Sequence, residues 1–502
     1  MKLERMRRWI ISLAIINFNL DVGPVVDILY PSISLTDAER ENVAFSSFPD
    51  TALFDTGSEV HSFRIPEGTT PQEDEATTHD IHWTPRPPSI DGYLYGYSLF
   101  HQRRDDSSKR GYLQRSVVIL SHLPYPSLFL TALHDLAPLY FSQGAPSLET
   151  ACHNIANWPD PTFGLSCELG FMGRVLNVEL PQDERQQQQP LQITSNADPP
   201  LLASVPPSDP SPLRIFAPCL PKLWSVWECL ILCEPLIIFA ATPREASLAV
   251  WWLYEFIRPL NAAIDLRPYF HIHDQDFERI VNKNGPRAGM LLGVTNPFFT
   301  NACKHWPHVL SLGRPPRHHH FHHKKDRDGQ ASKVPEASLK FGPDAGFHSR
   351  HQRYISKDKD LLKLLETAVQ KGGQAETEAV HLIRRHFSMR ASEVLGPLNR
   401  YFTSLIHNSD LPTLPSATKN STSSAASSHH KSDSGSGNFL GSFADADFLA
   451  SLKTHGSTLP FRTKAKQKEF YERWLKSPAF GIWLAERDAD TRTALKGKKR
   501  AR

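Results

Sequence analysis

The sequence lacks the short motifs by which many enzymes are recognised. It contains no GxxxxGK[ST] phosphate loop, no HExxH zinc motif and no GxSxG nucleophile elbow. The first absence removes the usual cradle for a bound nucleotide. The other two remove common signatures of metalloproteases and α/β-hydrolases. We therefore predict no catalytic residue and no cofactor.

The sequence also has no large excess of positive or negative charge and no long apolar stretch. The 56 basic and 53 acidic side chains leave a net charge of +3, so no global field attracts the chain to nucleic acid or anionic lipid. No apolar run reaches the roughly 18 residues of a membrane span. The best candidate, from Leu230 to Ala241, is interrupted by Cys233-Glu234-Pro235. These observations predict a cytoplasmic protein without a nucleic-acid partner or a transmembrane segment, which reaches membranes through its partners.

Cysteines are also few. The chain has six cysteines and no Cys-x-x-Cys pair, which is typical of reduced thiols in the cytosol. Cys229 and Cys233 are four residues apart on an expected helix. They are either half of a metal site that lacks two further ligands or core cysteines, and we favour the core.

The N-terminal part is predicted to be an α/β lobe. The apolar run from Trp9 to Ile16 follows basic residues, as in a secretory signal, but no small-residue cleavage site comes after it, which favours a buried first strand. Tyr93, Tyr95 and Tyr97 alternate along one arm of a hairpin, whose other arm is Tyr112 to Leu120. We expect these tyrosines to pack in the core rather than bind a partner. Two helices follow, one from Ser127, which Pro138 should kink or shorten, and one over Ser147 to Trp158.

The central part alternates strands and helices. Strands are expected at Leu236 to Ala240, Tyr269 to Ile272 and Gly289 to Val294, with a helix over Arg244 to Ile257. This alternation predicts a largely parallel sheet covered on both faces. The last strand ends at the polar pair Thr295-Asn296, and strand ends of this kind are where open α/β sheets engage partners.

Two groups of histidines raise the question of a metal. Arg317 to His323 contains five histidines, but polar and basic residues surround them, which favours a disordered insert over a scaffolded site. His271 and His273 alternate on the expected strand without an identifiable third ligand. We therefore predict no metal, and a metal-dependent enzyme built on these histidines is the weakest alternative.

Three phrases in the central part carry a family resemblance. RPYF-x-IHD from Arg267 to Asp274, LGVTNPFF from Leu292 to Phe299 and HWPH from His305 to His308 resemble the central region of DENN-domain protein family six, formerly "family 116". The resemblance covers about Phe18 to Gly313 well and the C-terminal helices more weakly. His271 does not match the family motif.

The resemblance implies an α/β fold with a longin-like N-terminal lobe, a central three-layer α/β DENN domain and a C-terminal helical portion. It also implies a guanine-nucleotide exchange factor for a Rab-family small GTPase, recruited to recycling endosomes, with Rab fourteen as the usual client and no covalent chemistry of its own. An adaptor that binds a Rab or a coat protein without exchange is the alternative.

The expected segments, taken from the resemblance and from shifts in composition, cover the chain from residue 9 to its end. They are the longin-like lobe (9–180), a flexible linker (181–212), the central domain (213–313), a histidine-rich insert (314–352), a helical portion (353–410), a disordered serine-rich insert (411–440), C-terminal helices (441–490) and a basic tail (491–502).

Four residues are candidates for a partner-binding site. We expect Arg267, Tyr269, Asp274 and Asn296 to lie near the junction of the two lobes and to help position a Rab-binding surface. The alternative is that they only stabilise the central fold. A flexible linker would let the two lobes grip the switch loops of the GTPase from both sides.

Overall fold

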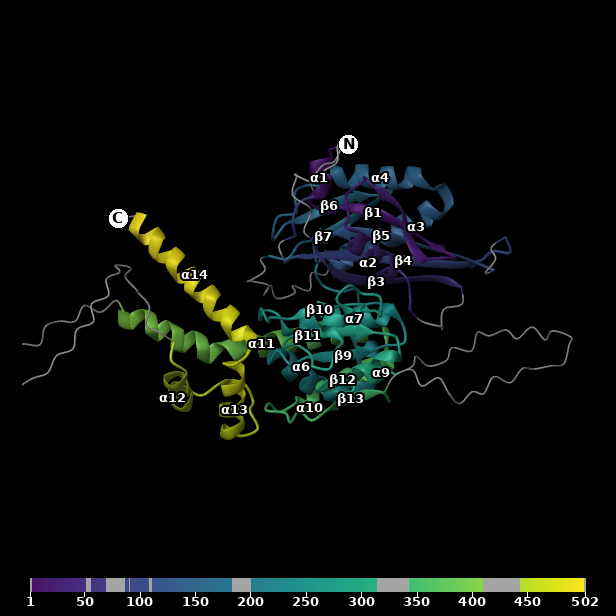
Figure 1. The fold of residues 1–502 in the computed structure, drawn as a ribbon. Coiled ribbons are helices and arrows are strands. Elements are labelled where there is room, and N and C mark those ends of the chain that lie inside the picture. Colours follow the sequence, from purple (N-terminus) through teal and green to yellow (C-terminus); the bar gives the residue numbers. More distant parts are fainter. Residues whose placement is uncertain are drawn as a thin grey trace, which may run out of the picture.

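The computed structural model of the chain describes residues 2–50, 56–68, 86–89, 91–107, 111–182, 200–313, 343–409 and 443–500, except the side chains of 406–409 and 494–500. The predicted linker residues 183–199, the histidine run and the serine-rich insert lie outside these ranges. Figure 1 shows two α/β lobes stacked on each other, with the C-terminal helices extending to one side.

The first lobe is a five-stranded antiparallel sheet with helices on both faces. Its strand order is β2-β1-β5-β4-β3. α2 (Asp37–Ser46) covers one face, and α3 (Pro126–Gln143) with α4 (Ala145–Ala156) covers the other. This arrangement agrees with the predicted longin-like lobe. The strands are β1 (Ser12–Asn19), β2 (Gly23–Tyr30), β3 (Gly57–Pro66), β4 (Tyr93–Arg104) and β5 (Tyr112–Ser121).

Most local predictions for this lobe are confirmed. The first strand is buried over Ser12 to Ile16, and the hairpin places Tyr95 and Tyr97 in the core. The expectation that Pro138 shortens the helix is wrong, because α3 continues through the proline to Gln143, and a kink there stays a prediction. A proline inside a helix costs about 3 kcal/mol, and the many buried apolar side chains of α3 offset that cost.

The central domain is a three-layer α/β unit, as predicted. Its strand order is β10-β11-β9-β12-β13, and only β13 runs antiparallel to its neighbour among the described strands. α6 (Leu223–Ile231) and α7 (Pro243–Ile257) cover one face, while α8 (Phe277–Ile280) and α9 (Phe298–Ala302) cover the other. The strands are β9 (Leu236–Phe239), β10 (Asp265–Arg267), β11 (Met290–Val294), β12 (His308–Ser311) and β13 (Gly346–Ser349).

Two strand predictions need correction. The strand expected at Tyr269 to Ile272 is wrong, because β10 ends at Arg267, immediately before Pro268. Proline has no N–H to continue the ladder, and the chain leaves the sheet after Phe270 donates one last bond to Gly293 O (2.8 Å). β13 was not predicted, since its residues were assigned to the histidine-rich insert.

Residues 200–212 of the predicted linker pack against the folded chain instead of forming a flexible connection. β8 (Leu201–Leu202) adds in parallel to β7 (Arg174–Glu179), which pairs with β6 (Ser166–Phe171). Ala203 is buried and its carbonyl accepts a bond from Ser127 N (3.2 Å). Ser211 then caps α5 (Pro212–Ile215), and η2 (Ala217–Lys222) leads into α6.

The C-terminal portion is helical. Phe470, Trp474 and Trp483, from the last two helices, are buried in the core. No helix among the described residues is long and apolar enough to cross a membrane. The helices are α10 (Lys359–Lys371), α11 (Gly373–Ser409), α12 (Asp445–His455), α13 (Lys464–Trp474) and α14 (Pro478–Arg500), the last of which includes part of the predicted basic tail.

Candidate functional site

Helix α7 joins the two lobes. It lies between the first lobe and the central sheet (Figure 1). Trp251 donates its indole N–H to Ser62 Oγ of β3 (2.8 Å), and its ring lies 6.0 Å from that of Tyr95. At the start of α7, the backbone N–H of Arg244 donates to Glu59 of β3 (3.1 Å). Buried hydrogen bonds of this kind hold the lobes in one relative position.

Tyr269 inserts from the central domain into the first lobe. Its side chain is only 1% exposed and packs within the apolar cluster of α2 and the first sheet. Its hydroxyl donates to Phe48 O (3.3 Å) and accepts from the backbone N–H of Asp50 (2.7 Å). Burial raises the pKa of this tyrosine far above 10, so the hydroxyl remains protonated.

Two buried histidines extend the same contact. His271 Nδ1 accepts the backbone N–H of His273 (3.1 Å), so Nε2 carries the ring proton and donates it to Ser46 Oγ (2.8 Å). His61 Nε2 donates to Ser46 O (2.8 Å). Burial lowers the pKa of His271 to about 3 and that of His61 to about 4, so both rings are neutral. Because both nitrogens of His271 are occupied, this residue does not provide the metal ligand considered above.

Arg267 forms the charged part of the junction. Its guanidinium, 0% exposed, pairs with Asp265 (2.9 Å) and Asp276 (2.7 Å) in the central domain. It also lies 5.0 Å from the ring of Tyr93 in β4. Arg64 of β3 stacks on the same ring (3.5 Å) and donates to the backbone carbonyl of Leu266 (3.0 Å). Two arginines from different lobes therefore share one tyrosine.

The other two predicted residues differ in their contact with the first lobe. Asn296 donates to Asp50 Oδ2 (2.8 Å), and neighbouring Thr295 donates to Asp50 O (3.1 Å), so both reach the first lobe. Asp274 is buried within the central domain and accepts the backbone N–H of Asp276 (2.8 Å). Asp274 reaches the junction through the charge of Arg267 and through its backbone N–H, which donates to His271 O (3.2 Å).

We call this buried contact the seam; its members from the central domain are Arg267, Tyr269, His271, Thr295 and Asn296. The structure thus places the predicted residues at or beside the lobe junction, but as packing and hydrogen-bonding groups. It also corrects the idea of two lobes hinged by a flexible linker, because the lobes are packed directly against each other. Sequence reasoning missed the partners in the first lobe, because more than 200 residues separate Ser46 from His271, Asp50 from Tyr269 and Asn296, and His61 from Tyr269.

Replacement of Asp274 by Asn should stabilise the protein at neutral pH. Burial, opposed by the charge of Arg267, raises the pKa of Asp274 to about 6, against about 3.9 when unfolded. The folded state therefore binds this proton more tightly, so wild-type stability improves as pH falls from 7 towards 4. Asn cannot ionise and keeps the bond to Asp276 N–H.

Urea unfolding of both proteins at pH 7 and pH 5 measures this effect. We expect Asp274→Asn to be more stable at pH 7 by on the order of 1–2 kcal/mol and the gap to shrink at pH 5. The titrations of other groups are common to both proteins and cancel. A variant less stable than wild type at pH 7 would mean that the charge of Arg267 stabilises the carboxylate by more than burial destabilises it, so that folding lowers the pKa of Asp274.

Partly exposed side chains near the seam come from both lobes. Leu20 (51% exposed) and Val22 (64%) lie in the β1–β2 turn. A methyl group placed on the next residue, Gly23, would lie 3.7 Å from Phe45 of α2, whose ring stacks on His273 of the central domain (4.3 Å). Phe298 of the central domain is 52% exposed at the start of α9, two residues after Asn296. We call Leu20, Val22, Phe45, His273 and Phe298 the seam surface.

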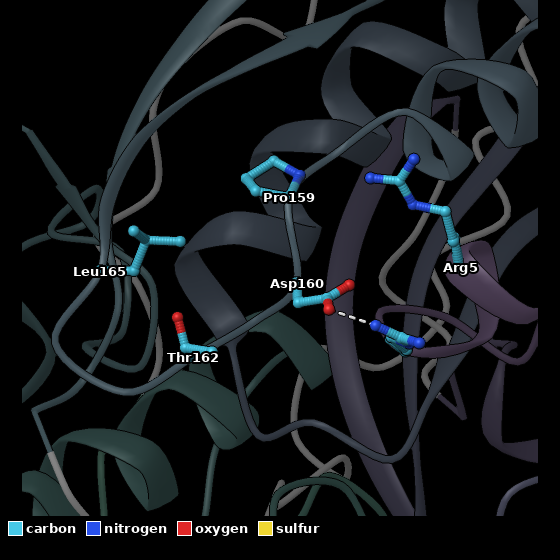
Figure 2. A pocket seen from close by; sticks show the side chains of 6 residues that line it. Arg5, Pro159, Asp160, Thr162 and Leu165 are labelled. Carbon is cyan, nitrogen blue, oxygen red and sulfur yellow. Dashed lines mark hydrogen bonds and ion pairs between the residues drawn. The ribbon is translucent and has the colours of Figure 1, made fainter.

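Two hollows in the described surface lie apart from the seam surface. One lies beside α1 (Leu3–Arg7) and the loop after α4, where Arg8 pairs with Asp160 and where Arg5 and Leu165 complete the wall (Figure 2). The other lies between residues 208–214 and the start of α11, where Arg214 pairs with Glu376 (2.7 Å). Each hollow is crossed by an ion pair.

The thiols also lack the properties of nucleophiles. Burial raises the pKa of Cys152, Cys219 and Cys303 to about 12, so these groups stay protonated at neutral pH. The seam has no partly exposed acid and base in contact among its described residues. Its histidines are neutral and internally bonded.

The fold and the seam define a two-lobed α/β protein whose two halves are locked into one body. Comparison with known proteins identifies it further. It is 32% identical over 494 residues to Protein DENND6B of Homo sapiens, covering 96% of this chain and 80% of the relative. It is 31% identical over 493 residues to Protein DENND6A of Mus musculus, covering 95% and 76%. The chain belongs to the DENND6 family of DENN-domain proteins.

More distant matches extend the same relationship. Protein DENND6 homolog of Dictyostelium discoideum is 28% identical over 482 residues, which cover 80% of this chain and 62% of that relative. No family model matches the chain. The resemblance in three central phrases therefore belongs to a relationship that spans both lobes and the C-terminal helices.

Proposed function

We propose that the chain is a guanine-nucleotide exchange factor for a Rab-family GTPase. Membership of the DENND6 family is the observation that carries the proposal. Exchange needs no reactive group, since it breaks no bond. The protonated thiols and the neutral, bonded rings of His61 and His271 are compatible with such a role. We further propose that the client is an endosomal Rab and that the protein acts at recycling endosomes.

The mechanism rests on linkage. A small GTPase holds its nucleotide through Mg²⁺, the phosphate loop and mobile switch segments. A partner that binds a displaced form of those segments weakens nucleotide affinity by the same factor by which the nucleotide weakens partner binding. Such a partner must be rigid, or its own deformation absorbs the binding free energy. The seam supplies this rigidity, because buried side chains from the two lobes share hydrogen bonds.

The seam surface is our candidate for the contact with the switch segments. Interfaces are built around apolar and aromatic side chains that become buried on binding. Leu20, Val22 and Phe298 are large, apolar and about half exposed or more. They come from both lobes, so the surface exists only while the seam is closed. We propose that an apolar switch segment of the GTPase covers them.

An adaptor that binds a Rab without exchange is the second candidate. Release of a fluorescent GDP analogue from a panel of Rab proteins separates the two. We expect the full chain to accelerate release from at least one Rab by about tenfold or more. A Rab that binds the chain with an unchanged release rate would favour the adaptor. The absence of both binding and acceleration across the panel would reject both candidates.

A further inference from the structure

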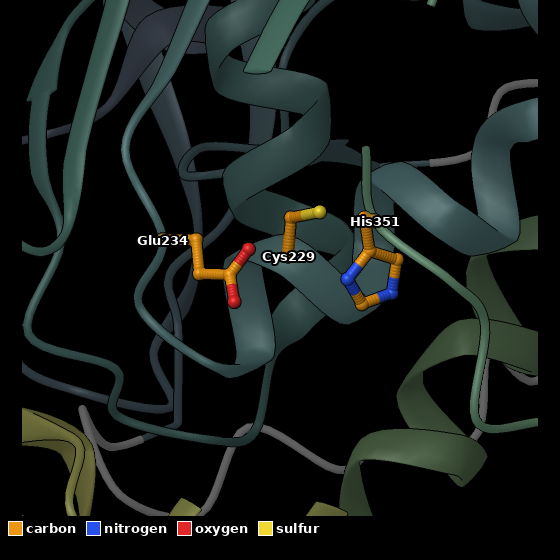
Figure 3. Close-up of side chains that lie close together, drawn as sticks. All are labelled: Cys229, Glu234 and His351. Carbon is orange, nitrogen blue, oxygen red and sulfur yellow. The ribbon is translucent and has the colours of Figure 1, made fainter. Parts of the chain in front are cut away.

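A separate cluster of ligand-type side chains lies in the central domain. Cys229 on α6, Glu234 in the following turn and His351 after β13 place one ligand atom each within 4.8 Å of the others (Figure 3). We propose that these three side chains bind a zinc ion, which ties the end of α6 to the segment after β13. The sequence alone predicted no metal here, because Cys229 was expected to be a core cysteine and His351 fell in the predicted insert.

The turn after α6 brings Glu234 back to Cys229. Cys233 adopts a left-handed conformation (φ 54°), which is uncommon for a residue other than glycine. The N–H of Glu234 then donates to Cys229 O (2.8 Å), and the N–H of Cys233 donates to Leu230 O (2.9 Å). These two bonds form a Schellman motif. The strained turn therefore fixes one thiol and one carboxylate on the same side of the helix end.

A buried carboxylate orients His351 towards this pair. His351 Nε2 bonds Glu228 Oε2 (2.7 Å), and both side chains are 1% exposed. Glu228 also accepts the backbone N–H groups of Tyr354 (3.0 Å) and Ile355 (2.8 Å), so it cannot rotate away. Nδ1 of His351 therefore keeps its lone pair, and Figure 3 shows one ring nitrogen turned towards Glu234. A carboxylate that bonds the second nitrogen of a histidine is the usual support of a zinc ligand.

Two more groups contact Glu234. His308 Nε2 touches Glu234 Oε2, while its Nδ1 bonds Ser349 Oγ (2.7 Å), so both nitrogens of His308 are engaged and it holds Glu234 from outside the set of three ligands. Arg473 of α13 contacts the other oxygen, Glu234 Oε1, and also donates to Tyr354 (2.9 Å). In the zinc-bound form we assign Arg473 to the outer oxygen of a ligating carboxylate. Its positive charge opposes a cation and is balanced by the thiolate and two carboxylates.

The donor set selects the metal. Thiolate, imidazole and carboxylate are all zinc donors, whereas calcium and magnesium bind oxygen. Ligand atoms around tetrahedral zinc lie about 3.5 Å apart, so the observed separations, all within 4.8 Å, need only small side-chain movements to close. Zinc binding would replace the thiol proton of Cys229.

Elemental analysis tests the proposal. The five histidines of the run from Arg317 to His323, namely His318, His319, His320, His322 and His323, are first replaced by serine so that they add no metal. The full chain is purified without a metal resin, equilibrated with zinc and freed of excess by gel filtration. We expect about one zinc per chain. A content below about 0.1 per chain would overturn the proposal.

Variants then locate the ion. Cys229→Ser and His351→Gln should each lose most of the zinc, whereas Cys219→Ser, which removes another buried thiol, should retain it. Cobalt substitution gives a second readout that needs no mutation, since a thiolate ligand produces an intense near-ultraviolet charge-transfer band. Bound cobalt without this band, or equal zinc in the wild type and in a folded Cys229→Ser variant, would contradict the assignment.

Discussion

Tyr269→Ala should lower the free energy of unfolding by about 3–5 kcal/mol, the usual cost of emptying a large buried aromatic site. The side chain fills the first lobe from the central domain, and both of its hydrogen bonds cross the seam. The substitution should therefore lower the stability of the protein and also uncouple the unfolding of the two lobes. Calorimetry of the wild type and the variant measures both effects, and we expect one transition to become two.

Tyr269→Phe is the matched control. It keeps the ring and removes only the hydroxyl, which leaves the backbone N–H of Asp50 without its acceptor. We expect a smaller loss of about 1–3 kcal/mol and a single transition. If Tyr269→Ala leaves both the midpoint and the single transition unchanged, the lobes are held together by other contacts and Tyr269 is not central to the seam.

The second large effect concerns the seam surface. Val22→Asp and Phe298→Asp each place a charge where an apolar switch segment would be buried, one in each lobe. We expect either change to reduce the catalysed GDP release rate by about tenfold or more, equivalent to about 1.4 kcal/mol. Both side chains are more than half exposed, so thermal stability should change little. Rates and melting temperatures are measured on the same preparations.

The first lobe provides closely matched controls for these variants. Val175 (62% exposed) and Phe163 (53% exposed) resemble Val22 and Phe298 in size and exposure, but they belong to the β6–β7 part of the lobe. Val175→Asp and Phe163→Asp should leave exchange unchanged. Equal losses from all four substitutions would show that added charge, rather than the seam surface, causes the effect.

The layered fold was largely predictable because it depends on local patterns. The apolar run of β1, the alternating tyrosines of β4 and the run of β11 each carry their own period, and each forms the expected strand. The strand expected at Tyr269 failed for a local reason, since Pro268 ends the ladder. β13 has no such signal, because four residues in a polar segment pair only when β12 is already in place.

The position of the seam residues near the lobe junction was predicted, but their contacts with the first lobe were not. Arg267, Tyr269 and Asn296 stand at strand ends, which the sequence shows. Whether such side chains face a partner or another part of the same chain depends on where residues such as Asp50 fold, and that is a long-range property. The seam surface left an even weaker signal, namely two apolar residues, Leu20 and Val22, in a turn.

We propose that the two packed lobes act as one rigid body, which binds a GTPase most tightly when the GTPase has lost its nucleotide. The most direct test is the affinity of the full chain for a responsive Rab in the nucleotide-free, GDP-bound and GTP-bound states, measured by calorimetry. We predict that the nucleotide-free form binds at least about tenfold more tightly than either nucleotide-bound form. Equal affinity for the three states, or a preference for the GTP-bound form, would contradict the account.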